Sequence, residues 1–147
     1  MLKVPASVMD RLRAHLEAGY PNEACGALIG QADDGVHRVS DFRAMRNTIT
    51  DRPWDRYALD PLEQLQVQKD AEANGLEIIG FAHSHPDHPP VPSRFDTDHA
   101  WSFYSYVVAS VQRGHLAEAR SWRLNGAKGF EEERLEIDQP QSGGVEA

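Results

Sequence analysis

Residues 76–96 read LEIIGFAHSHPDHPPVPSRFD, and this stretch contains an apolar run, two histidines one residue apart, a proline-rich loop, and a serine and an aspartate. The apolar run, which continues to Ala82, predicts a buried strand. Pro86 cannot donate to a strand ladder, and the three prolines that follow it keep the next segment extended and stiff. The strand should therefore end at the histidines.

His83 and His85 are placed to bind one metal ion. Successive side chains of a strand point to opposite faces, so these two imidazoles share a face. Asp96 lies in the first turn of an expected helix, and its carboxylate can approach the same ion as a third ligand. Two imidazole nitrogens and one carboxylate oxygen suit zinc, and three protein ligands leave one tetrahedral position for water, which is typical of catalytic sites.

Neighbouring polar residues also have simpler explanations. Ser93 and Asp96 match a capping box, in which each side chain accepts a hydrogen bond from the backbone of the other. If Asp96 is turned back onto the helix end, it should not face zinc through the same oxygen. Ser84 points away from the two histidines and is expected to be structural. His99, one turn after Asp96, is expected to be an exposed histidine rather than a spare ligand.

The spacing of these residues resembles the signature of a known enzyme family. The chain matches without a gap the H-[ST]-H-x7-S-x2-D pattern of the JAMM metallopeptidases, the catalytic branch of the MPN domain family, through His83, Ser84, His85, Ser93 and Asp96. The family also has a glutamate near the end of its first helix. Residues 20–30, YPNEACGALIG, are similar to that segment.

The resemblance implies a role for each matching residue. His83, His85 and Asp96 would be the metal ligands of one Zn²⁺ per chain. Glu23 would be the catalytic general base, and Ser93 would donate a hydrogen bond to the tetrahedral oxyanion. The implied fold is that of the MPN/JAMM domain, with a cytidine-deaminase-like architecture.

The resemblance also implies a substrate class. JAMM enzymes generally hydrolyse the amide bond after the C-terminal glycine of ubiquitin or a ubiquitin-like protein. This short chain is similar to compact prokaryotic members, including peptidases that release cysteine from a sulfur carrier ending in Gly-Gly. A zinc peptidase acting on such a carrier is the leading hypothesis. Two alternatives stay open: a non-catalytic module that binds ubiquitin-like proteins, and a small-molecule zinc amidohydrolase.

Length and composition set further limits. At 147 residues the chain can bury about two thirds of its unfolded surface as one domain. One cysteine excludes an internal disulfide and fits a reducing compartment. No apolar run is long enough to span a membrane, so a cytoplasmic protein is expected. The net charge of −8 disfavours nucleic acid and anionic membrane as partners. The oligomeric state is not predicted.

The remaining patterns predict a single α/β domain over residues 1–138, with a curved mixed sheet of about six strands and flanking helices. The helices are expected at 5–19, at 60–74 and from 93 onward. Besides the strand that ends at the histidines, strands are expected at 24–29, 36–42, 57–59, 106–111, 117–124 and 130–137. Residues 139–147 have the composition of a flexible tail.

Three residues near the expected site have two interpretations each. Cys25 follows Glu23 by two residues, so it is either a further zinc ligand or, more commonly for this residue type, a buried free thiol. Trp54 and Trp101 either line a groove for an extended peptide or belong to the core.

Overall fold

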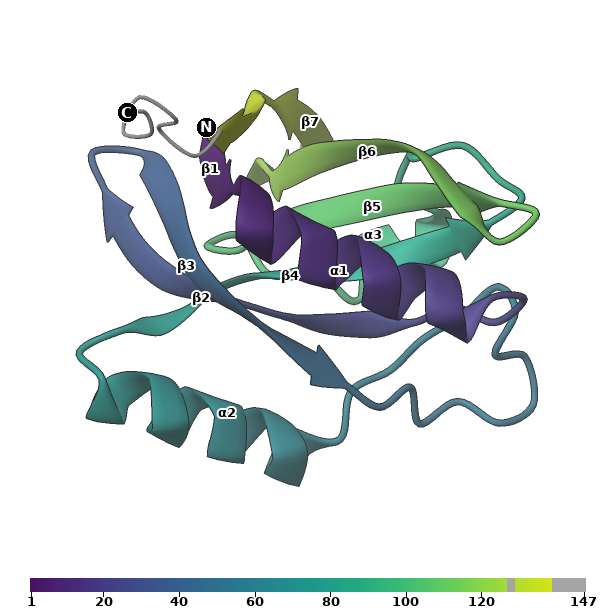
Figure 1. The fold of residues 1–147 in the computed structure, drawn as a ribbon, viewed down its shortest axis with the longest axis horizontal. Coiled ribbons are helices and arrows are strands. Elements are labelled where there is room, and N and C mark those ends of the chain that lie inside the picture. Colours follow the sequence, from purple (N-terminus) through teal and green to yellow (C-terminus); the bar gives the residue numbers. More distant parts are fainter. Residues whose placement is uncertain (127–128, 139–147) are drawn as a thin grey trace, which may run out of the picture.

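The computed structural model describes residues 1–126 and 129–138. In chain order the elements are β1 (Leu2–Pro5), α1 (Ala6–Gly19), β2 (Cys25–Asp33), β3 (Val36–Met45), α2 (Pro61–Ala73), β4 (Glu77–Pro86), α3 (Arg94–Asp98), β5 (Ser105–Gln112), β6 (His115–Leu124), β7 (Phe130–Glu133) and β8 (Leu135–Asp138). The strands form one mixed sheet in the order β7-β6-β5-β4-β2-β3-β1-β8 (Figure 1). The predicted single α/β domain with a mixed sheet is confirmed.

The strand count differs from the prediction, because the described residues contain eight strands rather than about six. Four N-terminal residues form β1, which pairs in parallel with both β3 and β8. The segment predicted as one strand over 130–137 is split at Arg134 into β7 and β8. The predicted strand at 57–59 is absent, since these residues are irregular.

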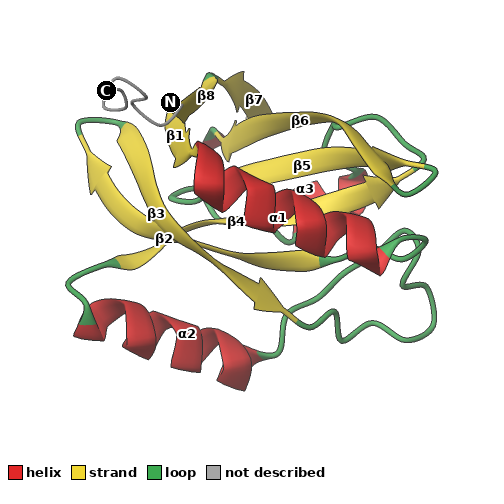
Figure 2. Ribbon diagram, viewed as in Figure 1, coloured by secondary structure: helices red, strands yellow, loops and turns green. Residues whose placement is uncertain are grey.

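The sheet is strongly curved. β7 and β8 are its opposite edges, yet a single residue, Arg134, separates them in sequence. The Leu2 amide donates to the Arg134 carbonyl at 2.8 Å, which joins β1 to this corner. Figure 2 shows β1, β7 and β8 close together at the top of the view. The curvature therefore brings the two edges of the sheet close together at one corner.

Two helices pack against different parts of the core. The buried residues of α1 recur at helical spacing and join one cluster with β4 and β5, and they are Val8, Met9, Leu12 and Leu16. Val67 and Ala71 of α2 join a second cluster with Phe81 and Tyr106. α2 begins as predicted, because the Asp60 side chain accepts a hydrogen bond from the Leu62 amide and a proline occupies the first turn.

A tight turn joins β2 to β3, as the sequence Asp-Asp-Gly predicts. Asp34 and Gly35 have φ angles of +50° and +77°, which suit the two central positions of a type I′ hairpin turn. The β6–β7 hairpin is also confirmed, with Leu124 paired to Phe130. Its five-residue loop is longer than a two-residue turn, as the sequence indicated.

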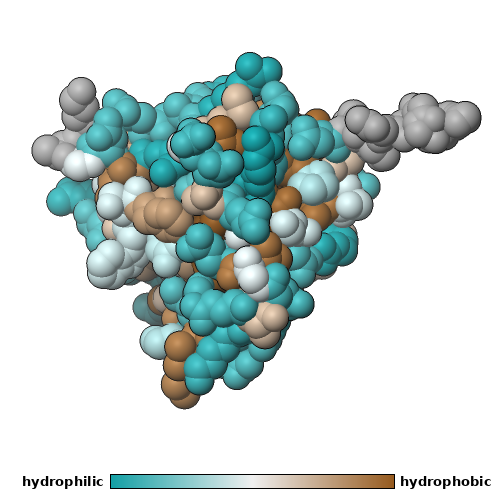
Figure 3. Space-filling view, turned by 90° about the vertical axis from the view of Figure 1, so that its left-hand side faces the viewer, coloured by the Kyte–Doolittle hydropathy of each residue, from teal (hydrophilic) through white to brown (hydrophobic). Residues whose placement is uncertain are grey.

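The surface is polar over much of its area. Figure 3 shows a largely hydrophilic face on which hydrophobic side chains form small separate groups. Among the described residues, no helix combines the length and the apolar character needed to cross a bilayer. Trp54 and Trp101 are 53% and 71% exposed, so neither is a core residue.

Candidate metal centre

β4 brings the two histidines into the interior. It lies between β2, which is antiparallel to it, and β5, which is parallel. Every residue of the strand after Glu77 is buried, including His83 and His85, which are 1% and 6% exposed. The two imidazoles continue the face on which Phe81 packs beneath α2. The strand ends at Pro86, as predicted.

His83, His85 and Asp96 place three potential ligand atoms close together. The two Nε2 atoms are 3.1 Å apart, and Oδ2 of Asp96 lies 3.2 Å from the first and 3.0 Å from the second. Ligands at about 2.0–2.1 Å from a tetrahedral zinc ion lie about 3.3 Å from one another. Two imidazole nitrogens and a carboxylate oxygen are also a donor set that zinc accepts. The three residues therefore fit a zinc ion.

Asp96 caps helix α3 with the same oxygen that faces the histidines. Its Oδ2 accepts a hydrogen bond from the Ser93 amide at 2.9 Å, and Ser93 Oγ accepts one from the Asp96 amide at 3.1 Å. The capping box is confirmed. The expectation that capping would exclude a metal-facing position was wrong, because a carboxylate oxygen has two lone pairs. One lone pair can accept the amide hydrogen bond while the other faces the site.

Hydrogen bonds and burial favour the neutral forms that metal binding requires. Nδ1 of His85 lies 3.1 Å from the Pro89 carbonyl, which can only accept, so Nδ1 carries the proton and Nε2 keeps its lone pair. Burial lowers the pKa of His83, whose ring stacks on Tyr57 at a centroid distance of 4.4 Å. Nδ1 of His83 has no hydrogen-bond partner among the described residues.

The carboxylate of Asp96 is ionised. Burial alone would raise its pKa, but a protonated His83, a hydrogen bond from either imidazole and the Ser93 backbone amide together hold the pKa well below its usual range; a metal ion would replace the imidazole protons between the three side chains. The site therefore combines one buried anion with two imidazoles, which is a favourable arrangement for a divalent cation.

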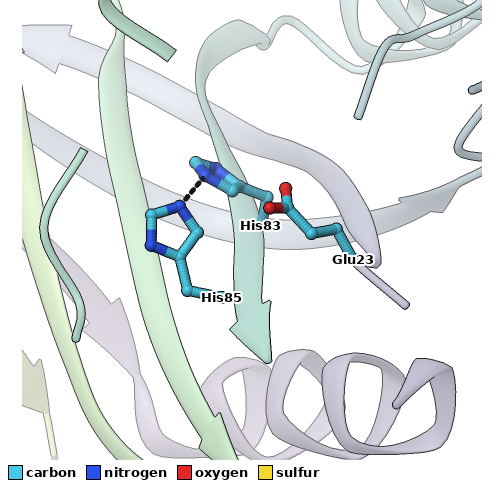
Figure 4. A group of neighbouring side chains, drawn as sticks. All are labelled: Glu23, His83 and His85. Carbon is cyan, nitrogen blue, oxygen red and sulfur yellow. Dashed lines mark hydrogen bonds between the residues drawn. The ribbon is translucent and has the colours of Figure 1, made fainter. Parts of the chain in front are cut away.

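Glu23 lies beside His83 and His85 and comes from the segment before β2 (Figure 4). One carboxylate oxygen of Glu23 and one ring nitrogen of each histidine all lie within 4.8 Å of one another. The side chain is 5% exposed, and its Oε1 has no partner in the described part of the chain. Burial raises the pKa of Glu23 to about 9, and the charges of Asp96 and Asp55 act in the same direction. Such a group readily holds a proton at neutral pH, and a nearby cation would lower its pKa.

Ser84 and Asn47 hold the Glu23 segment in place. Ser84, on the opposite face of β4 from the histidines, accepts a hydrogen bond from the Ala24 amide at 2.9 Å through Oγ. Nδ2 of Asn47 donates to the carbonyls of Glu23 and Arg56, at 3.1 and 3.0 Å. Oδ1 of Asn47 accepts hydrogen bonds from the backbone amides of Ile49 and Ala58. Ser84 is structural, as predicted, and Asn47 was missed because it lies in a segment without periodicity.

The other sequence candidates lie outside the ligand group. Cys25 is buried, and its thiol donates to the Met45 carbonyl at 3.8 Å, so it matches the buried free thiol rather than a ligand. His99 is exposed and its ring contacts the Phe95 carbonyl at 2.8 Å. Tyr57, which stacks on His83, was not predicted, because no sequence signal marks a lone aromatic residue in an irregular loop.

Two pockets meet at the site and share Pro92 and Phe95. The aromatic pocket has a volume of about 240 Å³ and opens on the His83 and Asp96 side, and its lining includes Tyr57, Phe81, Phe95, Trp101 and Tyr106. The charged pocket has a volume of about 570 Å³, and its lining includes Glu23, Arg52, Arg56, His85, Ser93 and Arg94. The candidate metal centre is thus accessible from two chemically different sides.

Comparisons with known proteins agree with this geometry. The family described as prokaryotic homologues of the JAB domain matches residues 5–125. The chain is 34% identical to a desampylase from Haloferax volcanii over 118 residues, which cover 74% of this chain and 80% of that protein. It is 32% identical to a CysO-cysteine peptidase from Mycobacterium tuberculosis, with 84% and 83% covered.

A solved structure shows the same fold over nearly the whole length. The solution structure of a protein from Desulfitobacterium hafniense matches with a TM-score of 0.84 at 30% identity, and the match covers 95% of this chain and 94% of that one. The resemblance inferred from the His-Ser-His signature is confirmed by these matches. The chain belongs to the JAB domain family, among its prokaryotic homologues.

Proposed function

We propose that this chain is a zinc-dependent peptidase that hydrolyses the amide bond after the C-terminal glycine of a ubiquitin-like sulfur-carrier protein. The observation that carries the proposal is the spacing of 3.0–3.2 Å between the ligand atoms of His83, His85 and Asp96, with the Glu23 carboxylate beside them. The names of the relatives, desampylase and CysO-cysteine peptidase, support hydrolysis of this type of substrate.

The proposed mechanism divides the work among five side chains. His83, His85 and Asp96 would hold the zinc ion, which when bound acidifies water and polarises a carbonyl group. Glu23 takes a proton from the attacking water and passes it to the departing amine. Ser93 Oγ accepts the Asp96 amide hydrogen bond, so its own proton is available to donate to the oxyanion.

The proposed peptidase domain covers residues 1–138, and residues 139–147 lie outside the described part of the chain. We place the protein in the cytoplasm, where a single cysteine in a buried, unbridged state is the ordinary condition.

The proposal can be tested with a panel of ubiquitin-like carriers. Each carrier is extended beyond its Gly-Gly terminus by a single amino acid or a short peptide, and is incubated with the zinc-loaded protein. Intact mass spectrometry then reports loss of the extension. Cleavage is expected with zinc and not after chelation, and readdition of zinc should restore it.

The two alternatives predict different results. If carriers bind but none is cleaved, although zinc is bound at His83, His85 and Asp96, the chain is a binding module. If no carrier binds or reacts, but small amides are hydrolysed in a zinc-dependent manner, it is a small-molecule amidohydrolase. Either result would contradict the proposed peptidase.

A further inference from the structure

Among the residues that the structure describes, one arginine of the charged pocket is not neutralised by a neighbouring acid. Arg52 is paired with Asp55, and Arg94 lies 3.9 Å from Asp98. Within the described residues, the guanidinium of Arg56 has neither an acidic partner within 4.0 Å nor a hydrogen-bond acceptor. In a chain with a net charge of −8, an unpaired cation lining the same pocket as the proposed general base requires an explanation.

Arg56 is held in a defined position although it has no acidic partner. Its guanidinium carbon lies 5.2 Å from the centroid of the Phe95 ring, a cation–π contact that orients the side chain over α3. Its carbonyl accepts a hydrogen bond from Nδ2 of Asn47, and the same nitrogen donates to the Glu23 carbonyl. One amide group therefore fixes the backbone of Arg56 relative to that of Glu23.

The position of Glu23 determines where the leaving group lies. Glu23 passes a proton to the departing amine, so that amine must enter the charged pocket, which Glu23 lines. If the amine is that of a terminal amino acid, its carboxylate carbon is two bonds away, at about 2.5 Å. The carboxylate must then occupy the same pocket. A lysine side chain joined through its amine would place uncharged methylene groups there instead.

An arginine side chain suits a leaving group that is a terminal amino acid with a free carboxylate. A guanidinium forms two parallel hydrogen bonds to a carboxylate, and this pairing is strongest where both groups are shielded from water. Arg56 is half-buried, so a bound carboxylate would be partly desolvated there. Methylene groups would gain nothing from the positive charge.

We propose that Arg56 binds the free α-carboxylate of the residue directly after the scissile bond, so that the enzyme prefers carriers extended by a single terminal amino acid. The proposal rests on the peptidase function above. In the reaction, water adds to the glycine carbonyl, the C–N bond breaks, and the amino acid leaves with the transferred proton. The carrier then ends in a glycine carboxylate, and no oxidant or reductant is needed.

The test uses three matched substrates on one carrier. The carrier ends in Gly-Gly-alanine with a free carboxylate, in Gly-Gly-alaninamide, or in an isopeptide bond to a lysine side chain. The wild-type protein should cleave the free acid with a kcat/KM about 10- to 100-fold above that of the amide, the range expected for one charge-assisted hydrogen-bonded pair. The isopeptide should be cleaved no better than the amide.

Arg56→Gln should reduce the ratio of free-acid to amide cleavage to about one, and Arg56→Lys should give an intermediate ratio because it keeps the charge but not the paired geometry. Arg13→Gln is the matched control, since it removes the same charge from an exposed position on α1. It should keep the wild-type ratio. Circular dichroism spectra of the variants establish that each is folded.

A binding measurement separates recognition from turnover. Titration calorimetry with the inactive Glu23→Gln protein should show tighter binding of the free-acid carrier than of the amide, and adding Arg56→Gln should remove the difference. Equal cleavage of the two carriers by the wild type, or a ratio that survives in Arg56→Gln, would overturn the proposal while leaving the peptidase function intact. Absence of cleavage of every carrier would refute the peptidase function itself.

Discussion

At the scale of single residues, one carboxylate oxygen serves both the fold and the site. Oδ2 of Asp96 accepts the Ser93 amide hydrogen and also faces His83 and His85. The hydrogen bond fixes the orientation of the carboxylate before any ion is bound, which lowers the cost of ordering it. The capping box would therefore preorganise Asp96 for its proposed role as a ligand.

Glu23→Gln should abolish catalysis without releasing zinc. Glutamine keeps the size of the side chain but cannot accept the proton, so cleavage should fall by about 10²–10⁴-fold, the usual contribution of a positioned general base. Intact mass spectrometry of the carrier measures cleavage, and metal analysis measures the zinc content per chain. Glu77→Gln is the matched control, because Glu77 is an exposed acid at the start of β4. Loss of zinc from Glu23→Gln would instead identify Glu23 as a ligand.

The thiol of Cys25 should be unreactive in the folded protein. Burial raises its pKa to about 12, and the charges of Glu63 and Glu23 act in the same direction. The thiolate is the reactive form, so raising the pH from about 7 to about 9 should not produce labelling by iodoacetamide. Mass spectrometry should detect the adduct only after the protein is unfolded in guanidinium. Labelling in native buffer at the rate of a free peptide thiol would contradict this prediction.

At the scale of elements, the parallel pairing of β4 with β5 positions the histidines. Gly80 lies opposite Ser105 in this pair, and His83 lies opposite Val108. A Cβ atom at Gly80 would lie 2.3 Å from the Ser105 carbonyl oxygen and 3.2 Å from a methyl group of Leu28. The backbones of β4 and β5 can be this close only because residue 80 has no side chain.

Gly80→Ala should therefore reduce both stability and zinc affinity. The added methyl must push β4 away from β5, which should cost about 1–3 kcal/mol of unfolding free energy or more. Denaturant unfolding measures the loss, and competition with a zinc-binding dye measures the affinity. Glu77→Ala, an exposed change in the same strand, should alter the unfolding free energy by less than about 0.5 kcal/mol. A variant with wild-type stability and zinc affinity would refute the role of this close approach.

At the scale of the whole molecule, the apolar core lies apart from the proposed metal ligands, so the fold should form without the ion. α1 and α2 each cover an apolar cluster that is complete without the ligand residues. The two edge strands of the sheet, β7 and β8, are also separated by a single residue of the chain, Arg134. The protein thus differs from small zinc domains, in which the ion supplies the folding energy.

Removal of the metal should abolish cleavage and leave the fold intact. After treatment with a chelator, the far-UV circular dichroism spectrum should be unchanged. The unfolding transition should also move to lower temperature. At a free zinc concentration of about 100 times Kd, the bound ion stabilises the folded state by about 2.7 kcal/mol, and chelation removes this stabilisation. Differential scanning calorimetry measures the shift. Loss of secondary structure on chelation would show that the ion is structural.

The amino-acid sequence by itself determined the α/β class, most of the elements and the residues of the proposed metal centre. These follow from local rules: the alternation along β4 places His83 and His85 on one face, Pro86 ends the strand, and Ser93 begins the next helix. Such rules depend on residues within a few positions of one another, so they can be read from a single chain.

Only the tertiary structure decided what surrounds that centre. The register between β2 and β4 brings Glu23 to the histidines across sixty residues of sequence, and the hydrogen bonds of Asn47 place Arg56 in the same pocket. The 46–60 segment has no periodicity, so its sequence alone could not show these contacts. The arrangement of the sheet edges was likewise hidden, because β1 is too short to give a strand pattern and no sequence signal marks the break at Arg134 that separates β7 from β8.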